Sequence, residues 1–172
     1  TIDILRRCGI EVVTVSVTGT RLIKGSHGIP VMVDTVFRKG EISQSQGLIL
    51  PGGMPGAQNL YLHEGLRKSL IAHNMRETLI AAICAAPIVL GRRDLLNGRR
   101  ATCYPGFEDE LHGAHIVNER VCEDGHIITA RGPGCVNDFA FAIAARFVDS
   151  ATLSRVKSDM LLFDVLKETG KN

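Results

Sequence analysis

The stretch TLIAAICAAP, residues 78–87, decides the fold that the sequence predicts. Its apolar part, TLIAAIC, is typical of a short strand buried on both faces of a sheet, and Pro87 suits the first turn of a following helix. Cys84 therefore lies where a strand turns sharply into a helix, with Ala85 and Ala86 as small neighbours. A cysteine in this place is either a small buried hydrophobe or a nucleophile presented beyond the sheet. The stretch by itself leaves both open.

Strand and helix signals alternate along the rest of the chain. Apolar or β-branched runs predict strands, and apolar residues at helical spacing predict helices. We expect strands at 10–17, 47–50 and 78–84, further extended pieces at 100–103, 115–123 and 126–130, and helices at 1–8, 63–74, 87–93, 136–149 and 153–168. The pair Asp124-Gly125 predicts a two-residue hairpin turn. This alternation indicates an α/β fold with a mainly parallel sheet covered by helices on both faces.

Composition and charge exclude several classes of function. The chain is 45% hydrophobic and 22% charged, as in an ordinary soluble globular protein. With no visible repeat or linker, we expect one domain over residues 1–172. A net charge of +2 is too small for a nucleic-acid partner. The longest apolar run, 79–90, contains a proline and is too short to cross a bilayer, and no signal peptide opens the chain, so we expect no membrane partner.

The five cysteines are scattered and form no CxxC pair. This pattern favours reduced thiols in a reducing, cytoplasmic compartment over a disulfide framework or a zinc site, and we expect no metal. Cys103 is either a resolving partner for Cys84 or, more simply, a buried strand residue. Cys135 is interpreted as a capping or packing residue, and Cys8 and Cys122 as structural.

Two motifs are expected at the same rim of the sheet, because ligands bind beyond the carboxyl ends of parallel strands. LPGG ends the strand at 47–50, and AICAAP ends the strand at 78–84. The N-terminus of the following helix favours the thiolate form of Cys84, and the N–H of Ala85 faces the place where an oxyanion forms. Gly52 and Gly53 allow close approach to a ligand, and Gly53 is a second candidate oxyanion donor. The alternative for PGG alone is a simple turn.

The motifs LILPGGMPGAQNL, LIAAICAAP and ITARGPG, in this order and followed by an apolar helix, resemble the ThiJ/PfpI superfamily. The most similar branch is that of the Parkinson-disease protein deglycase and its bacterial relatives. The resemblance implies a flavodoxin-like sandwich, a homodimer, Cys84 as the reactive thiol, and Gly53 and Ala85 as oxyanion donors. Family activities include cofactor-free conversion of methylglyoxal to lactate, deglycation, holdase chaperoning and peroxide sensing.

The chain departs from this family in three places. In the family, a strand and a glutamate that hydrogen-bonds the cysteine precede the helix that begins here at Thr1, and this chain has neither. Because a missing inner strand leaves backbone groups unpaired, we expect that segment to exist but to be cleaved, disordered or unrecorded. Tyr104 stands where many members have a histidine, as a hydrogen-bond donor or as an aromatic pocket wall. His27 stands where relatives often have an arginine that reaches the partner subunit, and is interpreted as an anion ligand or a plain surface histidine.

The sequence therefore favours a cofactor-free, cysteine-dependent enzyme of the glyoxalase or deglycase type that acts on a small aldehyde. The alternative is a redox sensor or holdase that uses oxidation of Cys84, and a third possibility is a degenerate relative with a scaffold role. Cys–His protease or amidase chemistry is disfavoured, because the residue after the cysteine is Ala85 where the protease branch has its histidine base.

Overall fold

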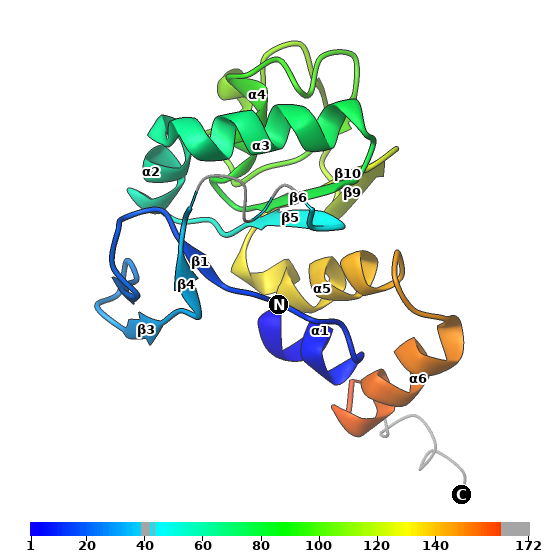
Figure 1. The fold of residues 1–172 in the computed structure, drawn as a ribbon. Helices are drawn as coiled ribbons and strands as arrows, with labels where there is room; N and C mark the ends of the chain where they lie inside the picture. The colour runs from blue at the N-terminus through cyan, green and yellow to red at the C-terminus, as the bar shows by residue number, and fades with distance from the viewer. Residues whose placement is uncertain (39–41, 43, 163–172) are drawn as a thin grey trace, which may run out of the picture.

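The centre of the molecule is a four-stranded sheet with the strand order β5-β6-β10-β9 (Figure 1). The computed structural model describes residues 1–38, 42 and 44–162. The parallel strands are β5 (Gly47–Leu50), β6 (Leu79–Ile83) and β10 (Ile127–Ala130), and β9 (Val121–Asp124) pairs with β10 in the antiparallel sense. The register places Ile80 between Leu48 and Ile127. The apolar runs of the sequence thus form the mainly parallel sheet that they predict.

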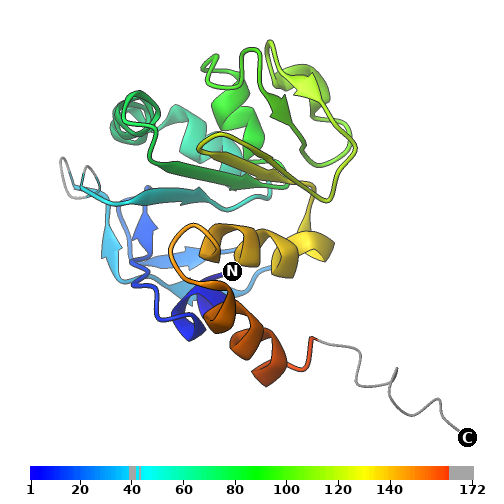
Figure 2. The ribbon, with the colours of Figure 1, turned by 90° about the vertical axis from the view of Figure 1, so that its right-hand side faces the viewer.

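Helices cover both faces of this sheet, as Figure 2 shows from the side. One layer contains α2 (Gly56–Leu62), α3 (Glu64–Met75) and α4 (Pro87–Gly91), and the other contains α1 (Ile2–Arg7), α5 (Val136–Ala144) and α6 (Ser150–Asp159). Side chains alternate along β6 between two buried clusters. Ile80 and Ala82 belong to the cluster of the α2–α4 layer, and Ala81 and Ile83 to the cluster of the other layer. Because all of β6 is buried, its sequence is apolar without alternation.

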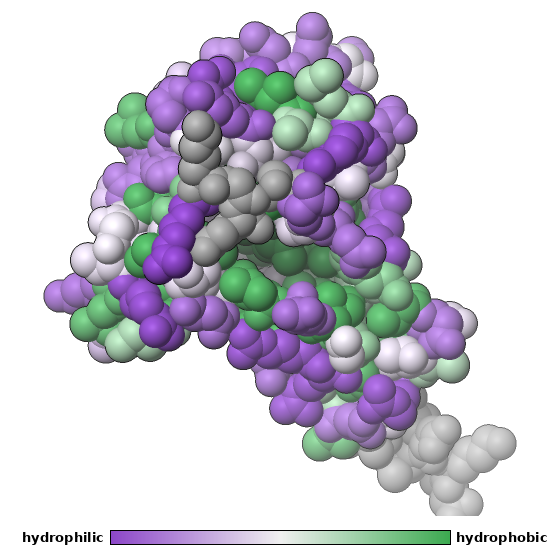
Figure 3. Space-filling view, viewed as in Figure 1, coloured by the Kyte–Doolittle hydropathy of each residue, from purple (hydrophilic) through white to green (hydrophobic). Residues whose placement is uncertain are grey.

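The segment between α1 and β5 forms two small sheets. β1 (Val15–Ser16) pairs in parallel with β4 (Thr35–Val36), and β2 (Leu22–Lys24) forms a hairpin with β3 (Pro30–Met32). Across residues 1–38, 42 and 44–162, no backbone hydrogen bond joins β1 or β4 to β5. In the space-filling view, hydrophobic residues gather in a hollow on the side of the molecule that faces the viewer, between the sheet and the layer of α1 and α5 (Figure 3).

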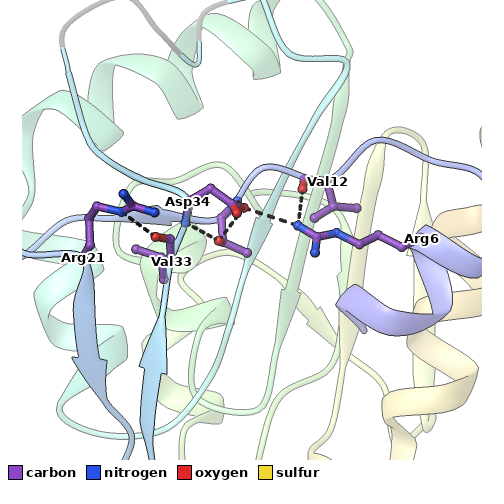
Figure 4. Close-up of polar contacts among 6 residues, drawn as sticks. Arg6, Val12, Arg21, Val33 and Asp34 are labelled. Atoms are coloured by element: carbon purple, nitrogen blue, oxygen red, sulfur yellow. Dashed lines mark hydrogen bonds and ion pairs between the residues drawn. The ribbon is translucent and has the colours of Figure 1, made fainter.

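Asp34 ties this segment to α1 (Figure 4). Its Oδ2 accepts hydrogen bonds from the N–H and the hydroxyl of Thr14, at 2.8 and 2.7 Å, and lies 3.3 Å from a guanidinium nitrogen of Arg6. Arg6 also donates to the carbonyl of Val12 at 2.8 Å. The hydrogen bonds from Thr14, supported by the nearby arginine, hold the pKa of the Asp34 carboxyl below its usual value. The carboxylate is therefore the shared anchor of the helix and the strands.

Most predicted elements are confirmed, with differences at their ends. The extended piece expected at 115–123 is instead two separate strands, at His115–Ile116 and Val121–Asp124, which pair with different neighbours. The strand expected at 10–17 is reduced to Val15–Ser16, because only that part of it meets a partner strand. The helix expected at 136–149 ends at Ala144, and a new helix starts at Ser150, where Asp149 caps it by accepting the N–H of Thr152 at 2.8 Å. That last helix ends at Asp159, and the part of the expected segment beyond residue 162 lies outside the described residues.

The predicted hairpin is present, but its turn lies one residue later than expected. Asp124 pairs with Ile127 in the ladder, so the two turn residues are Gly125 and His126. The side chain of Asp124 is held in place because its carboxylate accepts the N–H of Arg100 at 2.9 Å.

The other extended pieces are short. β7 (Arg100–Ala101) pairs in parallel with β8 (His115–Ile116), and single 3-10 turns lie at Glu108–Glu110 and Pro133–Cys135. Among the described helices, none has the length and apolar character needed to cross a membrane.

Candidate functional site

Cys84 lies immediately after β6 in a left-handed backbone conformation, with a φ of 65°. Its N–H donates to the carbonyl of Ala130 and its own carbonyl accepts the N–H of Tyr104, both at 2.9 Å. A non-glycine residue in this region is strained, and two hydrogen bonds from neighbouring segments hold it there. The predicted turn from strand to helix is therefore present, with α4 beginning at Pro87.

The LPGG loop packs directly against this turn. A Cβ on Gly52 would lie 2.5 Å from both the Cβ of Cys84 and the carbonyl oxygen of Ile83, and 3.3 Å from the nitrogen of Ala85. Such a contact is too short for any side chain, so only glycine fits. The structure thus brings Gly52, Cys84 and Ala85 together, at the rim where the sequence placed them.

Gly53 has a φ of +87°, and a Cβ there would lie 3.0 Å from the hydroxyl of Ser26. Within the described part of the chain, no hydrogen-bond acceptor is recorded for the N–H of Gly53 or of Ala85. Backbone N–H groups beside a nucleophile that have no partner in the fold can donate to a developing negative charge.

The loop of the β2–β3 hairpin lies over the LPGG loop, which the sequence did not predict. The hydroxyl of Ser26 donates to the carbonyl of Met54 at 3.1 Å, 28 residues away. His27, the next residue, is exposed. The glycines on either side of the SH pair, in KGSHG, were the available signal for this turn.

Tyr104 lies beside Cys84 through its backbone, and its ring packs on Gly132. A Cβ on Gly132 would lie 3.2 Å from a ring carbon of Tyr104. The tyrosine side chain is 46% exposed and forms one wall of a cavity of about 430 Å³. This position is consistent with the interpretation of Tyr104 as an aromatic pocket wall.

The remaining thiols are buried. Cys8, Cys103, Cys122 and Cys135 are at most 6% exposed, whereas Cys84 is half-buried. Burial raises the pKa of Cys103 to about 11, with a further contribution from the carboxylate of Glu108. Burial also raises the pKa of Cys8 and Cys122. Among the described residues, no group of three His, Cys, Asp or Glu side chains is arranged to hold a metal ion.

Comparison with known proteins identifies the family. The model of the DJ-1/PfpI family matches residues 1–146. The chain belongs to this family. It is 34% identical to Protein DJ-1 homolog B of Arabidopsis thaliana over 94% of the chain and 37% of that protein. It is 32% identical to a protein of Pyrococcus abyssi named a deglycase, over 66% of the chain and 69% of that protein.

A solved structure of the same family shares the fold. The oxidized DJ-1 of Toxoplasma gondii is 33% identical, with a TM-score of 0.86 over 93% of this chain and 88% of that chain. This similarity confirms the flavodoxin-like α/β fold. The chain spans little more than a third of the Arabidopsis relative, so the activity of that whole protein is not carried over to it.

The close contact between Gly52 and the turn at Cys84 predicts that any side chain at position 52 disturbs the turn. Gly52→Ala is expected to lower the free energy of unfolding by about 1–3 kcal/mol and to slow alkylation of Cys84, because the new methyl group displaces the turn. The control is Gly56→Ala at the start of α2, where a Cβ meets nothing within 4 Å and stability should change by less than about 1 kcal/mol. Urea denaturation and thiol alkylation measure both effects. Equal behaviour of the two variants would contradict the close contact.

The raised pKa of Cys103 predicts a loss of stability in alkali. Below the ordinary thiol value of 9.0 the proton is bound in both states, whereas between 9.0 and about 11 only the unfolded chain releases it. The free energy of unfolding should therefore fall as the pH rises through this window. The part due to Cys103 is the difference between the wild type and Cys103→Ala, measured by urea denaturation at pH 7, 9 and 10.5. If the free energy of unfolding falls equally with pH in the two proteins, the Cys103 thiol is not a source of the loss of stability in alkali.

Proposed function

We propose that the chain is a cysteine-dependent, cofactor-free enzyme of the glyoxalase III or deglycase type. Its substrates would be methylglyoxal, glyoxal or their adducts, and its role a defence against oxidative stress in the cytoplasm. The observation that carries the proposal is the turn at Cys84, where a half-buried cysteine packs against Gly52 and is flanked in sequence by Ala85. The N–H groups of Ala85 and of Gly53, the residue after Gly52, have no acceptor within the described part of the chain. The deglycase name of the Pyrococcus relative supports the same class of chemistry.

The geometry suggests the first chemical step. The thiolate of Cys84 adds to the aldehyde carbon, a C–S bond forms, and the π-electron pair of the carbonyl moves to its oxygen. The N–H groups of Gly53 and Ala85 then donate to this oxygen in the resulting hemithioacetal. Conversion to a hydroxy acid also needs a proton shuttle, which in the family is a glutamate before the first helix. We assign no residue of this chain to that role, and Tyr104 is a candidate hydrogen-bond donor.

Removal of the thiol tests the enzyme proposal. Cys84→Ala is expected to lose at least about 10³-fold in methylglyoxal turnover, because no other group would form the adduct. Cys122→Ala removes a buried thiol from β9 and should retain the wild-type rate per folded molecule. Lactate formation is measured after the mass of each purified protein has been checked. Similar rates in the wild type and Cys84→Ala would refute the proposal.

A non-enzymatic function is the second candidate, because Cys84 is the one cysteine of the five that is not buried. Two equivalents of hydrogen peroxide would oxidise its thiolate to a sulfinate and be reduced to two equivalents of water. The modified protein would then act as a redox sensor or a holdase. This function is favoured if neither protein turns over methylglyoxal while mild peroxide adds two oxygen atoms to Cys84 alone.

We also propose that the chain forms a homodimer through the β2–β3 hairpin. Leu22, Ile29, Val31 and Met32 on this hairpin are 49–66% exposed, which is more apolar surface than one small hairpin normally shows to water. The hairpin also contacts the LPGG loop through Ser26, so a second copy bound there would lie close to Cys84.

A charge on this surface tests the dimer. Met32→Glu is expected to shift the molecular mass in solution, measured by light scattering, from that of a dimer to that of a monomer, because the carboxylate would lose its water at the interface. Met75→Glu, on the exposed end of α3, is the matched control and should leave the mass unchanged. A monomeric wild type, or a dimeric Met32→Glu, would place the interface elsewhere or exclude it.

A further inference from the structure

The cavity beside Tyr104 has a cationic wall that the chemistry at Cys84 does not use. Its volume is about 430 Å³, and it is lined by Tyr104, Pro105, Arg120, Arg131 and the turn 132–135. Two of these lining residues are arginines and none is acidic. The cavity is broad and open to solvent, so a small ligand there would be held mainly by the charged side chains of its wall.

Two backbone hydrogen bonds fix this cavity next to Cys84. Ala130 accepts the N–H of Cys84, and the next residue in the chain is Arg131. Tyr104 donates its own N–H to the carbonyl of Cys84 on the other side. One wall residue, Tyr104, is therefore bonded directly to the backbone of Cys84, and a second, Arg131, follows the residue that accepts the Cys84 N–H. Cys84 itself is not part of the wall, so the cavity lies next to the turn of the nucleophile.

The two arginines differ in how their charge is balanced. Arg120 donates from Nε to the Asp138 carboxylate at 2.8 Å and from a second nitrogen to the carbonyl of Gly134 at 2.7 Å. Its charge is therefore balanced by Asp138, which lies outside the wall. Arg131 donates to the amide oxygen of Asn118, a neutral group, so no acidic partner among the described residues balances its positive charge. A guanidinium has five N–H donors, so Arg131 has others for a ligand.

The helix that follows the cavity adds no net positive charge, because Asp138 lies in its first turn. The turn Pro133–Cys135 leads into the nine-residue helix α5, whose N-terminus carries the positive end of the helix dipole. The nearby carboxylate of Glu108 accepts the N–H of Gly106 at 2.7 Å and is not part of the wall. The wall as a whole therefore presents one positive charge, that of Arg131, without an acidic partner among the described residues.

We propose that this cavity is a carboxylate subsite, and that the preferred substrates of Cys84 are aldehydes that carry a carboxylate a few atoms from the carbonyl carbon. Arg131 binds that carboxylate and orients the carbonyl toward the thiol. This inference rests on the proposed function, since it names the substrate class of the same nucleophile. Arg131 is a specificity-determining residue, because it contacts the substrate away from the bond that forms.

A pair of alkylating reagents tests the subsite without relying on turnover. Iodoacetate and iodoacetamide have nearly the same size, and with both the Cys84 thiolate forms an S–C bond as iodide leaves with the electron pair of the C–I bond. Only iodoacetate carries a carboxylate. We expect wild-type Cys84 to favour iodoacetate over iodoacetamide at least tenfold more than a small free thiol does. Acetate should slow the iodoacetate reaction and not the iodoacetamide reaction.

Substitution of the arginine should remove this preference. In Arg131→Gln we expect the iodoacetate rate to fall about tenfold and the iodoacetamide rate to stay within about twofold, which a general disturbance of the site would not produce. Arg131→Lys keeps the charge and should retain part of the preference. Arg146→Gln is the matched control, because that arginine pairs with Glu123 and is not in the wall of this cavity.

The outcomes separate this inference from the proposed function. If Cys84 reacts with iodoacetamide and shows no preference for iodoacetate, or if Arg131→Gln slows both reagents equally, the carboxylate subsite is refuted and the enzyme proposal stands. If Cys84 reacts with neither reagent, both are refuted. A preference that persists in Arg131→Gln and is lost in Arg146→Gln would place the anion site elsewhere.

Discussion

The backbone at Cys84 is the constraint on which the candidate site depends. The residue lies in a left-handed conformation that costs a non-glycine residue about 1–3 kcal/mol. Two hydrogen bonds, one to Ala130 and one from Tyr104, hold it there from opposite sides. Each bond in a buried place also satisfies a polar group that would otherwise destabilise the fold. The strain is therefore maintained by the sheet and by the loop after β7, and not by the turn itself.

The same constraint explains the residues around the turn. Gly52 has no side chain because the Cβ of Cys84 occupies that space. Tyr104 reaches the site because its N–H is needed by the carbonyl of Cys84, and Gly132 is small where the tyrosine ring packs. Three loops from distant parts of the sequence thus meet at the turn, because Gly52 and Tyr104 contact Cys84 and Gly132 contacts Tyr104.

The sequence predicted the parts of the fold that depend on local pattern. The buried runs of β5 and β6, the helix after Pro87 and the meeting of Gly52 with Cys84 all follow from apolar periodicity and from the rule that parallel strands end at one edge. The β2–β3 hairpin was missed because its strands are short and largely exposed, so they show no alternation.

The cationic cavity was missed for a different reason. Arg131 is brought to it by the pairing of β10 with β6, and Tyr104 by a single backbone bond between residues 20 apart in the sequence. Neither contact leaves a local signal. The length of the strand at 10–17 was also overestimated, because β-branched residues favour extended backbone whether or not a partner strand is present.

The four buried cysteines are built-in probes of unfolding. In the folded chain Cys84 is half-buried and the other four cysteines are buried, whereas in the unfolded chain all five thiols are accessible. The number of thiols accessible to a reagent therefore counts unfolded molecules directly, without an added label. Local opening can be assigned as well, since Cys8 reports on α1, Cys122 on the edge strand β9 and Cys135 on the start of α5. Thiol labelling of the unmodified chain can therefore show which parts of this fold open first.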